Sequence, residues 1–152
     1  MTIIYRIFSL IINFVAVMLG ISLLGSIPLL ASSPQTLLSG FLMIAVILYA
    51  WFSFRFRREV LQKRQVVRTS LRDYVRVNEI VTLVFCFFSL ISVVSLLVNP
   101  QPFLDAVKVL KFDMPLKTAI SFFYIMLAYA VIQIVHILWT FALLKKNREY
   151  FE

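Results

Sequence analysis

The chain has 152 residues, of which 62% are apolar and only 14% are charged, whereas soluble domains contain about 25% charged residues. A soluble domain of this size cannot bury so much apolar surface, so the composition excludes a soluble fold and indicates a membrane protein. The net charge is +8, and the basic residues flank apolar runs. We therefore expect anionic lipid head groups, not nucleic acid, to be the counterpart of this charge.

The few cysteines and histidines exclude several kinds of site. Cys86 is the only cysteine and His136 the only histidine. A disulfide framework or a Cys-x-x-Cys redox pair needs more cysteines, and a structural zinc site takes four ligands of these types. We therefore expect no metal and no cofactor.

The first apolar run covers residues 7–30 without a charge. A helix of about 20 residues crosses a hydrocarbon core of roughly 30 Å, so this run is long enough to span a membrane. A cleaved signal peptide is the alternative, because Arg6 precedes the run and small residues follow it. Its apolar segment is much longer than the roughly 7–15 residues usual in signal peptides, which favours a retained helix. Pro28 and Pro34 are expected to interrupt helical structure between the first two spans, where serines favour a turn or a helix cap.

Three further apolar runs complete a prediction of four transmembrane helices. They cover residues 37–54, 80–98 and 118–144. A loop at 99–117 separates the last two, and apolar residues at helical spacing within it predict a short amphipathic helix at about 103–112, lying in the membrane interface. The whole chain, 1–152, is predicted to be a single all-α transmembrane domain, an antiparallel four-helix bundle.

The connector at 55–79 carries eight of the fifteen Lys and Arg residues. Its apolar residues recur at helical spacing, so we expect helical extensions of the neighbouring spans with a bend around residues 68–70. Positive charge concentrates on the cytoplasmic side of membrane proteins. This predicts that the connector and both termini are cytoplasmic, in a bacterial inner membrane or an equivalent cell membrane.

A polar face is predicted on the fourth span. Tyr129, Gln133, His136 and Thr140 are spaced 4, 3 and 4 residues apart, which keeps them on one side of a helix. Such a face in hydrocarbon must contact protein or a cavity. It is interpreted either as a polar pathway or ligand pocket, or, as we prefer, as interhelical hydrogen bonding. Asn13 in the first span also needs a partner, and we expect it in Gln133 or His136.

Ionisable residues are missing from the predicted spans. Residues 7–54, 80–104 and 118–144 contain no Asp, Glu, Lys or Arg. Ion-coupled transporters and small four-helix multidrug exporters rely on an ionisable group within the membrane. This absence argues against both classes.

A basic ridge is the one positive indication of an interaction surface. Arg68, Arg72 and Arg76 are four residues apart, which aligns them on a helix. The ridge suits anionic lipid or an acidic partner protein, although basic residues here also serve simply to set topology.

These patterns predict a non-enzymatic membrane protein that acts as a scaffold, an accessory subunit or a lipid- or partner-binding component, as a homo-oligomer or within a complex. The alternative is a passive channel or small-molecule transporter that uses the polar face of the fourth span. A membrane enzyme that uses His136, or Arg76 with Glu79, is a third and weaker interpretation.

Overall fold

The computed structural model describes residues 3–30, 33–109, 111 and 114–152. The described residues form helices joined by short turns and contain no β-strand. In chain order the elements are α1 (Ile3–Leu30), α2 (Pro34–Phe56), the π-helical turn η1 (Arg57–Gln62), α3 (Thr69–Val98), α4 (Gln101–Val109), α5 (Leu116–Lys146) and the 3₁₀ turn η2 (Arg148–Tyr150).

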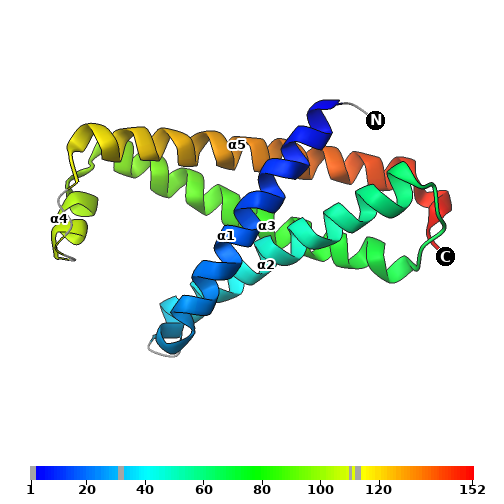
Figure 1. Cartoon of the computed structure of the whole chain (residues 1–152), viewed down its shortest axis with the longest axis horizontal. Helices are drawn as coiled ribbons and strands as arrows, with labels where there is room; N and C mark the ends of the chain where they lie inside the picture. Colours follow the sequence, from blue (N-terminus) through cyan, green and yellow to red (C-terminus); the bar gives the residue numbers. More distant parts are fainter. Residues whose placement is uncertain (1–2, 31–32, 110, 112–113) are drawn as a thin grey trace.

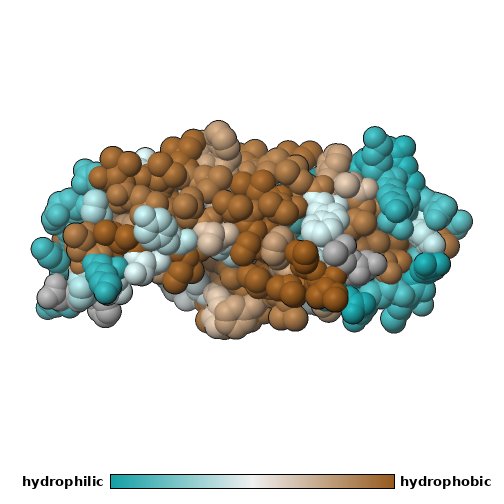
Figure 2. Space-filling model, turned by 90° about the horizontal axis from the view of Figure 1, so that it is seen from above, coloured by the Kyte–Doolittle hydropathy of each residue, from teal (hydrophilic) through white to brown (hydrophobic). Residues whose placement is uncertain are grey.

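Four helices are long and apolar enough to cross a membrane, as expected of a multi-pass membrane protein. These segments are Ile3–Pro28, Thr36–Gln62, Thr69–Val98 and Leu116–Lys146. A helix of 30 residues is about 45 Å long, well above the roughly 30 Å of the hydrocarbon core. Each helix therefore extends beyond the apolar run that predicted it. Figure 2 shows the consequence as a broad hydrophobic belt between two hydrophilic ends.

The helices do not all run alongside one another. α3 and α5 form a long pair, and α2 lies against α3, whereas α1 crosses over α5 at a steep angle and then leaves it (Figure 1). The connector and the C-terminus lie at one end of the molecule, here called the connector end, and α4 lies at the other. The crossing means that α1 covers only part of α5.

The turn between α1 and α2 contains a capping box. The Ser33 side chain accepts from the Thr36 backbone N–H at 3.2 Å, and the Thr36 hydroxyl oxygen accepts from the Ser33 N–H at 3.1 Å. Pro34 occupies the first turn of α2, where a missing N–H costs nothing. The prediction that Pro28 interrupts the helix was wrong, because Pro28 lies inside the last turn of α1.

The connector differs from the predicted helical bend. Residues 63–68 are not helical, and α3 begins at Thr69. Val67 N–H donates to the Tyr150 carbonyl at 2.8 Å, and Thr69 N–H donates to that of Glu152, also at 2.8 Å. The C-terminal residues thus hold the connector as a short parallel bridge, an interaction between distant segments that helical periodicity cannot predict.

Three apolar clusters follow one another along the molecule. The cluster at the connector end includes Phe56, Val75 and Leu144, and the central cluster includes Tyr49, Cys86 and Ile137. The cluster at the α4 end contains Val93, Ala119 and Phe123. Between the first two lies a layer of buried polar side chains.

The short helix α4 begins two residues before the predicted start. Phe103 contacts Phe123 of α5 edge to face, with ring centroids 5.0 Å apart. None of its described residues is fully buried. The predicted end at 112 lies outside the described residues.

Candidate functional site

A closed polar cluster joins α1, α2 and α5 near the connector end. The Tyr49 hydroxyl lies 2.7 Å from His136 Nδ1 and 3.3 Å from Thr140 Oγ1. The Tyr5 hydroxyl lies 3.0 Å from the same Thr140 oxygen, which itself donates to the His136 carbonyl at 2.8 Å. Because the Thr140 hydroxyl donates its one proton to that carbonyl, the Tyr5 hydroxyl must donate to the Thr140 oxygen. The cluster thus holds three helices together through hydroxyl groups.

Ring stacking reinforces this cluster. The rings of Tyr5 and His136 are stacked with centroids 4.6 Å apart, and Tyr49 meets His136 edge to face at 5.9 Å. His136 and Thr140 have no exposed surface, and Tyr5 has 1%. His136 is therefore held by packing on two sides, while its Nε2 atom has no hydrogen-bond partner.

The other two residues of the predicted polar face are placed differently. Gln133 is fully buried, but among the described residues neither its amide oxygen nor its amide nitrogen has a hydrogen-bond partner. The hydroxyl of Tyr129 is likewise buried, with no partner in the described part of the chain. One helix face therefore carries a bonded pair, His136 and Thr140, and an unbonded pair, Tyr129 and Gln133.

Asn13 does not bond to α5 as expected. Its amide nitrogen donates to the Ser9 carbonyl one turn earlier in α1, at 2.5 Å. The side chain borders a shallow hollow between α1 and α2 that Trp51 and Phe54 also line. The expected partnership with Gln133 or His136 was wrong, because a local backbone acceptor satisfies the amide.

Glu79 is the buried polar residue that the predicted span boundaries left out. The third span was predicted to begin at residue 80, but α3 begins at Thr69, and Glu79 is only 1% exposed within the packed helices. Neither carboxylate oxygen has a hydrogen-bond partner within the part of the chain that the structure describes. The statement that the predicted spans lack ionisable residues is correct for the stated ranges, but it does not extend to the buried core.

One arginine lies near this carboxylate, and a second lies near the polar cluster. Arg76 is the cation that acts on Glu79, and Arg57 lies within electrostatic range of both Tyr5 and His136. The Nε atoms of both arginines are buried, with no hydrogen-bond partner among the described residues. A buried carboxylate is costly unless cations or donors surround it, so Arg76 is its natural compensation.

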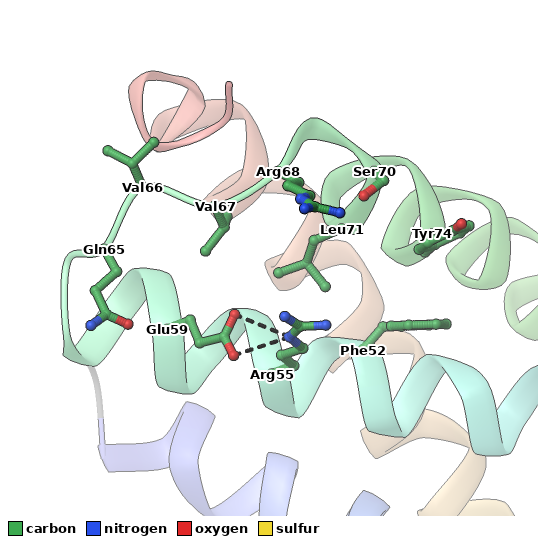
Figure 3. Close-up of a pocket in the computed structure, with 10 residues that line it drawn as sticks. All are labelled: Phe52, Arg55, Glu59, Gln65, Val66, Val67, Arg68, Ser70, Leu71 and Tyr74. Carbon is green, nitrogen blue, oxygen red and sulfur yellow. Dashed lines mark hydrogen bonds and ion pairs between the residues drawn. The ribbon is translucent and has the colours of Figure 1, made fainter.

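A cavity of about 490 Å³ opens beside the connector (Figure 3). Phe52, Leu71 and Tyr74 form its apolar side, and the Phe52 and Tyr74 rings stack 5.2 Å apart. Arg55 and Arg68 supply its cations. Arg55 Nε lies 3.0 and 3.1 Å from the two carboxylate oxygens of Glu59, while no ion pair of Arg68 is present among the described residues.

The three arginines of the predicted ridge have different surroundings. Arg68 precedes α3 and lines the cavity. Arg72 Nε lies 3.1 Å from Asp73 Oδ1. The guanidinium of Arg76 lies over the Phe141 ring, 5.7 Å from the ring centroid. Arg68 is therefore the ridge residue that faces a cavity, whereas Arg76 packs against α5.

Sequence periodicity missed Tyr5, Tyr49 and Glu79. Tyr49 lies within the second predicted span, outside any polar pattern, yet it has no exposed surface. A signal did exist for Tyr5, because it lies one turn before Ser9 on the helix face that continues to Ile12 and Ala16, and all four are buried. No comparable signal marks Glu79, which looks like one more charge of the connector.

Comparisons of the chain with protein-family models, with curated proteins and with solved structures found no match.

Proposed function

We propose that the protein is a non-enzymatic membrane component that binds an anionic lipid head group at its connector, as a scaffold or accessory subunit. In this proposal the four helices form a bundle in a bacterial inner membrane or an equivalent membrane. The connector and both termini are cytoplasmic, in keeping with the distribution of Lys and Arg. The protein acts as a homo-oligomer or within a membrane complex.

The observation that carries the proposal is the connector cavity. It combines an apolar side made of Phe52, Leu71 and Tyr74 with a cation at Arg68 that no carboxylate neutralises among the described residues. A lipid has the complementary chemistry, since its phosphate accepts hydrogen bonds from a guanidinium and its glycerol and first methylenes are apolar.

The surrounding charge favours the same ligand. The chain carries fifteen basic and seven acidic side chains, and basic residues near a membrane surface gain about 1 kcal/mol each from anionic lipid. Arg55 already pairs with Glu59, and Arg68 has no ion pair among the described residues, so Arg68 is the cavity cation that is available to phosphate.

The test compares two charge reversals in the connector. Arg68→Glu changes a residue that lines the cavity, whereas Lys63→Glu makes the same change of charge at an exposed connector position outside it. Protein purified in nanodiscs that contain phosphatidylglycerol and phosphatidylcholine is transferred to detergent, and retained lipid is counted by native mass spectrometry. We expect Arg68→Glu to reduce retained phosphatidylglycerol at least about fivefold, as the loss of one favourable charge implies.

The control separates a site from general attraction. Lys63→Glu should leave the retained phosphatidylglycerol within twofold of the wild type. An equal loss of phosphatidylglycerol in both variants would mean that the basic connector residues set topology and attract lipid only in general. Equal retention of phosphatidylglycerol in both variants would exclude the cavity as a lipid site. Unchanged thermal unfolding of each variant shows that the helices remain packed.

A channel or small-molecule transporter is the second candidate function. The burial of Glu79 is the observation that favours it. A buried ionisable residue in a membrane protein is a functional candidate by default. The polar face itself speaks against an open pathway, because His136 and Thr140 are fully buried and bonded to Tyr5 and Tyr49. Proteoliposome uptake of protons or small cations that disappears in Glu79→Gln but persists in Arg68→Glu would favour transport over lipid binding.

A further inference from the structure

An apolar groove runs between α1, α3 and α5 near the middle of the helices. Ile11, Val15 and Leu19 of α1 form one wall, and the volume is about 500 Å³, within the range of small-molecule sites. The groove exists because α1 leaves α5 after crossing it (Figure 1). Ile125 and Met126 at its border are 67% and 39% exposed, so the groove opens sideways to the surrounding hydrocarbon.

Besides Cys86 and Ser89, two larger polar side chains interrupt this apolar lining. Gln133 and Tyr129 both line the groove, and Gln133 is fully buried. The Gln133 amide offers a donor and an acceptor, and the Tyr129 hydroxyl offers both, yet none of these atoms has a partner among the described residues. In hydrocarbon no water replaces a missing partner, so unbonded amides are rare and costly. A bound molecule with a carbonyl or hydroxyl group would complete their hydrogen bonding.

The depth of Gln133 restricts the kind of molecule. Lys146, at the charged end of α5, lies thirteen positions after Gln133, a distance of about 20 Å along the helix. Phospholipid head groups remain at the interface, roughly 15 Å from the centre of the hydrocarbon core. A phosphate therefore cannot reach Gln133, and an acyl chain that reaches it has no polar atom to offer.

We infer that the groove binds a neutral molecule that dissolves in the membrane and presents a carbonyl or hydroxyl group to Gln133 and Tyr129 from an otherwise apolar body. This site is separate from the connector cavity, and it does not depend on lipid head groups or on Arg68.

Photolabelling with benzophenone tests the inference, because this probe is a ketone on an apolar body. The protein is irradiated in nanodiscs with benzophenone, and adducts are mapped by peptide mass spectrometry. Excited benzophenone inserts into a nearby C–H bond, forming a carbon–carbon bond while its carbonyl becomes an alcohol. We expect adducts to concentrate on Met126, within reach of the groove.

Three variants and one matched control test whether the groove recognises the carbonyl group of the probe or only its apolar body. Gln133→Leu and Gln133→Met remove the hydrogen-bonding group and should each lower Met126 labelling about fivefold, as expected for one lost hydrogen bond. Ala128→Phe fills the groove from its exposed border and should abolish labelling. Ala142→Phe, at an exposed position on the same helix outside the groove, is the matched control and should label like the wild type.

Two results would overturn the inference. Full Met126 labelling in both Gln133 variants would mean that the groove binds apolar molecules without hydrogen bonding to a polar group. Full labelling in Ala128→Phe would mean that the probe reacts from bulk lipid. Arg68→Glu should leave the labelling unchanged, so a failure here is distinguishable from a failure of lipid binding at the connector.

Discussion

The polar face of α5 divides into two regions, each with two polar side chains, that have opposite surroundings. His136 and Thr140, toward the connector end, are covered by Tyr5 and Tyr49 and exchange hydrogen bonds with them. Tyr129 and Gln133, in the preceding two turns, border an apolar groove, and their polar atoms have no partner among the described residues. A shared helix face therefore does not guarantee a shared role.

The crossing of α1 explains the difference. α1 contacts α5 at its own N-terminal end, where Tyr5 meets His136, Trp139 and Thr140, and it then moves away from α5 (Figure 1). Had the two helices run alongside each other, the residues of α1 that follow Tyr5 would have filled the groove beside Gln133. The crossing thus produces both the bonded region and the groove.

The largest expected contrast comes from truncating the tyrosines. Tyr5→Ala removes a buried ring, its stacking on His136 and its bond to Thr140, and should lower the free energy of unfolding by about 3–5 kcal/mol, as for other buried aromatic residues. Tyr129→Ala removes a ring that is only half-buried and should cost clearly less. Reversible unfolding in mixed micelles containing SDS measures both. Equal losses would mean that the two regions are packed alike.

Removing only the hydroxyl groups sharpens the contrast. Tyr49→Phe leaves His136 Nδ1 without its partner in a buried site, which costs up to about 3 kcal/mol. Tyr129→Phe removes a hydroxyl that has no partner and should be neutral or stabilising in the absence of ligand. The same unfolding titration compares the two variants. A loss in Tyr129→Phe as large as that in Tyr49→Phe would show that the Tyr129 hydroxyl is bonded within the protein.

The sequence predicted the helices well because membrane-spanning length and hydropathy are local properties. All four predicted spans lie within helices of the structure, and a short helix lies between the third and fourth. The boundaries were too narrow because hydropathy marks only the apolar part of each helix, whereas charged residues such as Arg55 continue a helix as readily as apolar ones. Glu79 was therefore treated as part of the connector although it is buried.

The candidate sites depended on contacts that the sequence does not encode locally. The spacing of Gln133, His136 and Thr140 indicated a face that must be covered in lipid, and all three residues are buried. Their partners could not be predicted, since Tyr5 and Tyr49 approach from helices whose crossing is set by tertiary packing. For the same reason Asn13 was assigned a distant partner although its own helix provides one.

Most substitutions of a buried polar residue lower the free energy of unfolding, whereas Gln133→Leu is expected to raise it. Replacing an amide that has no partner with an apolar side chain of similar size should stabilise the empty protein by about 1–2 kcal/mol, because the unpaired donor and acceptor disappear. Thermal unfolding in detergent without added apolar ligands checks this prediction. Destabilisation of 1 kcal/mol or more would show that Gln133 bonds within the protein and would weaken the case for a ligand.

Thr140→Val gives the smallest effect and the most direct measure of the bonded region. The substitution keeps the shape but removes the oxygen that accepts from Tyr5 at 3.0 Å and lies 3.3 Å from the Tyr49 hydroxyl. Hydrogen bonds between membrane helices contribute about 0.6 kcal/mol on average, so we expect a loss of about 1 kcal/mol in the unfolding titration.

Thr118→Val, at an exposed position near the other end of α5, is the matched control and should change stability by less than about 0.5 kcal/mol. If the two variants behave alike, the hydroxyl cluster adds nothing beyond packing. The bonded and unbonded regions of α5 would then differ only in their ability to bind a ligand.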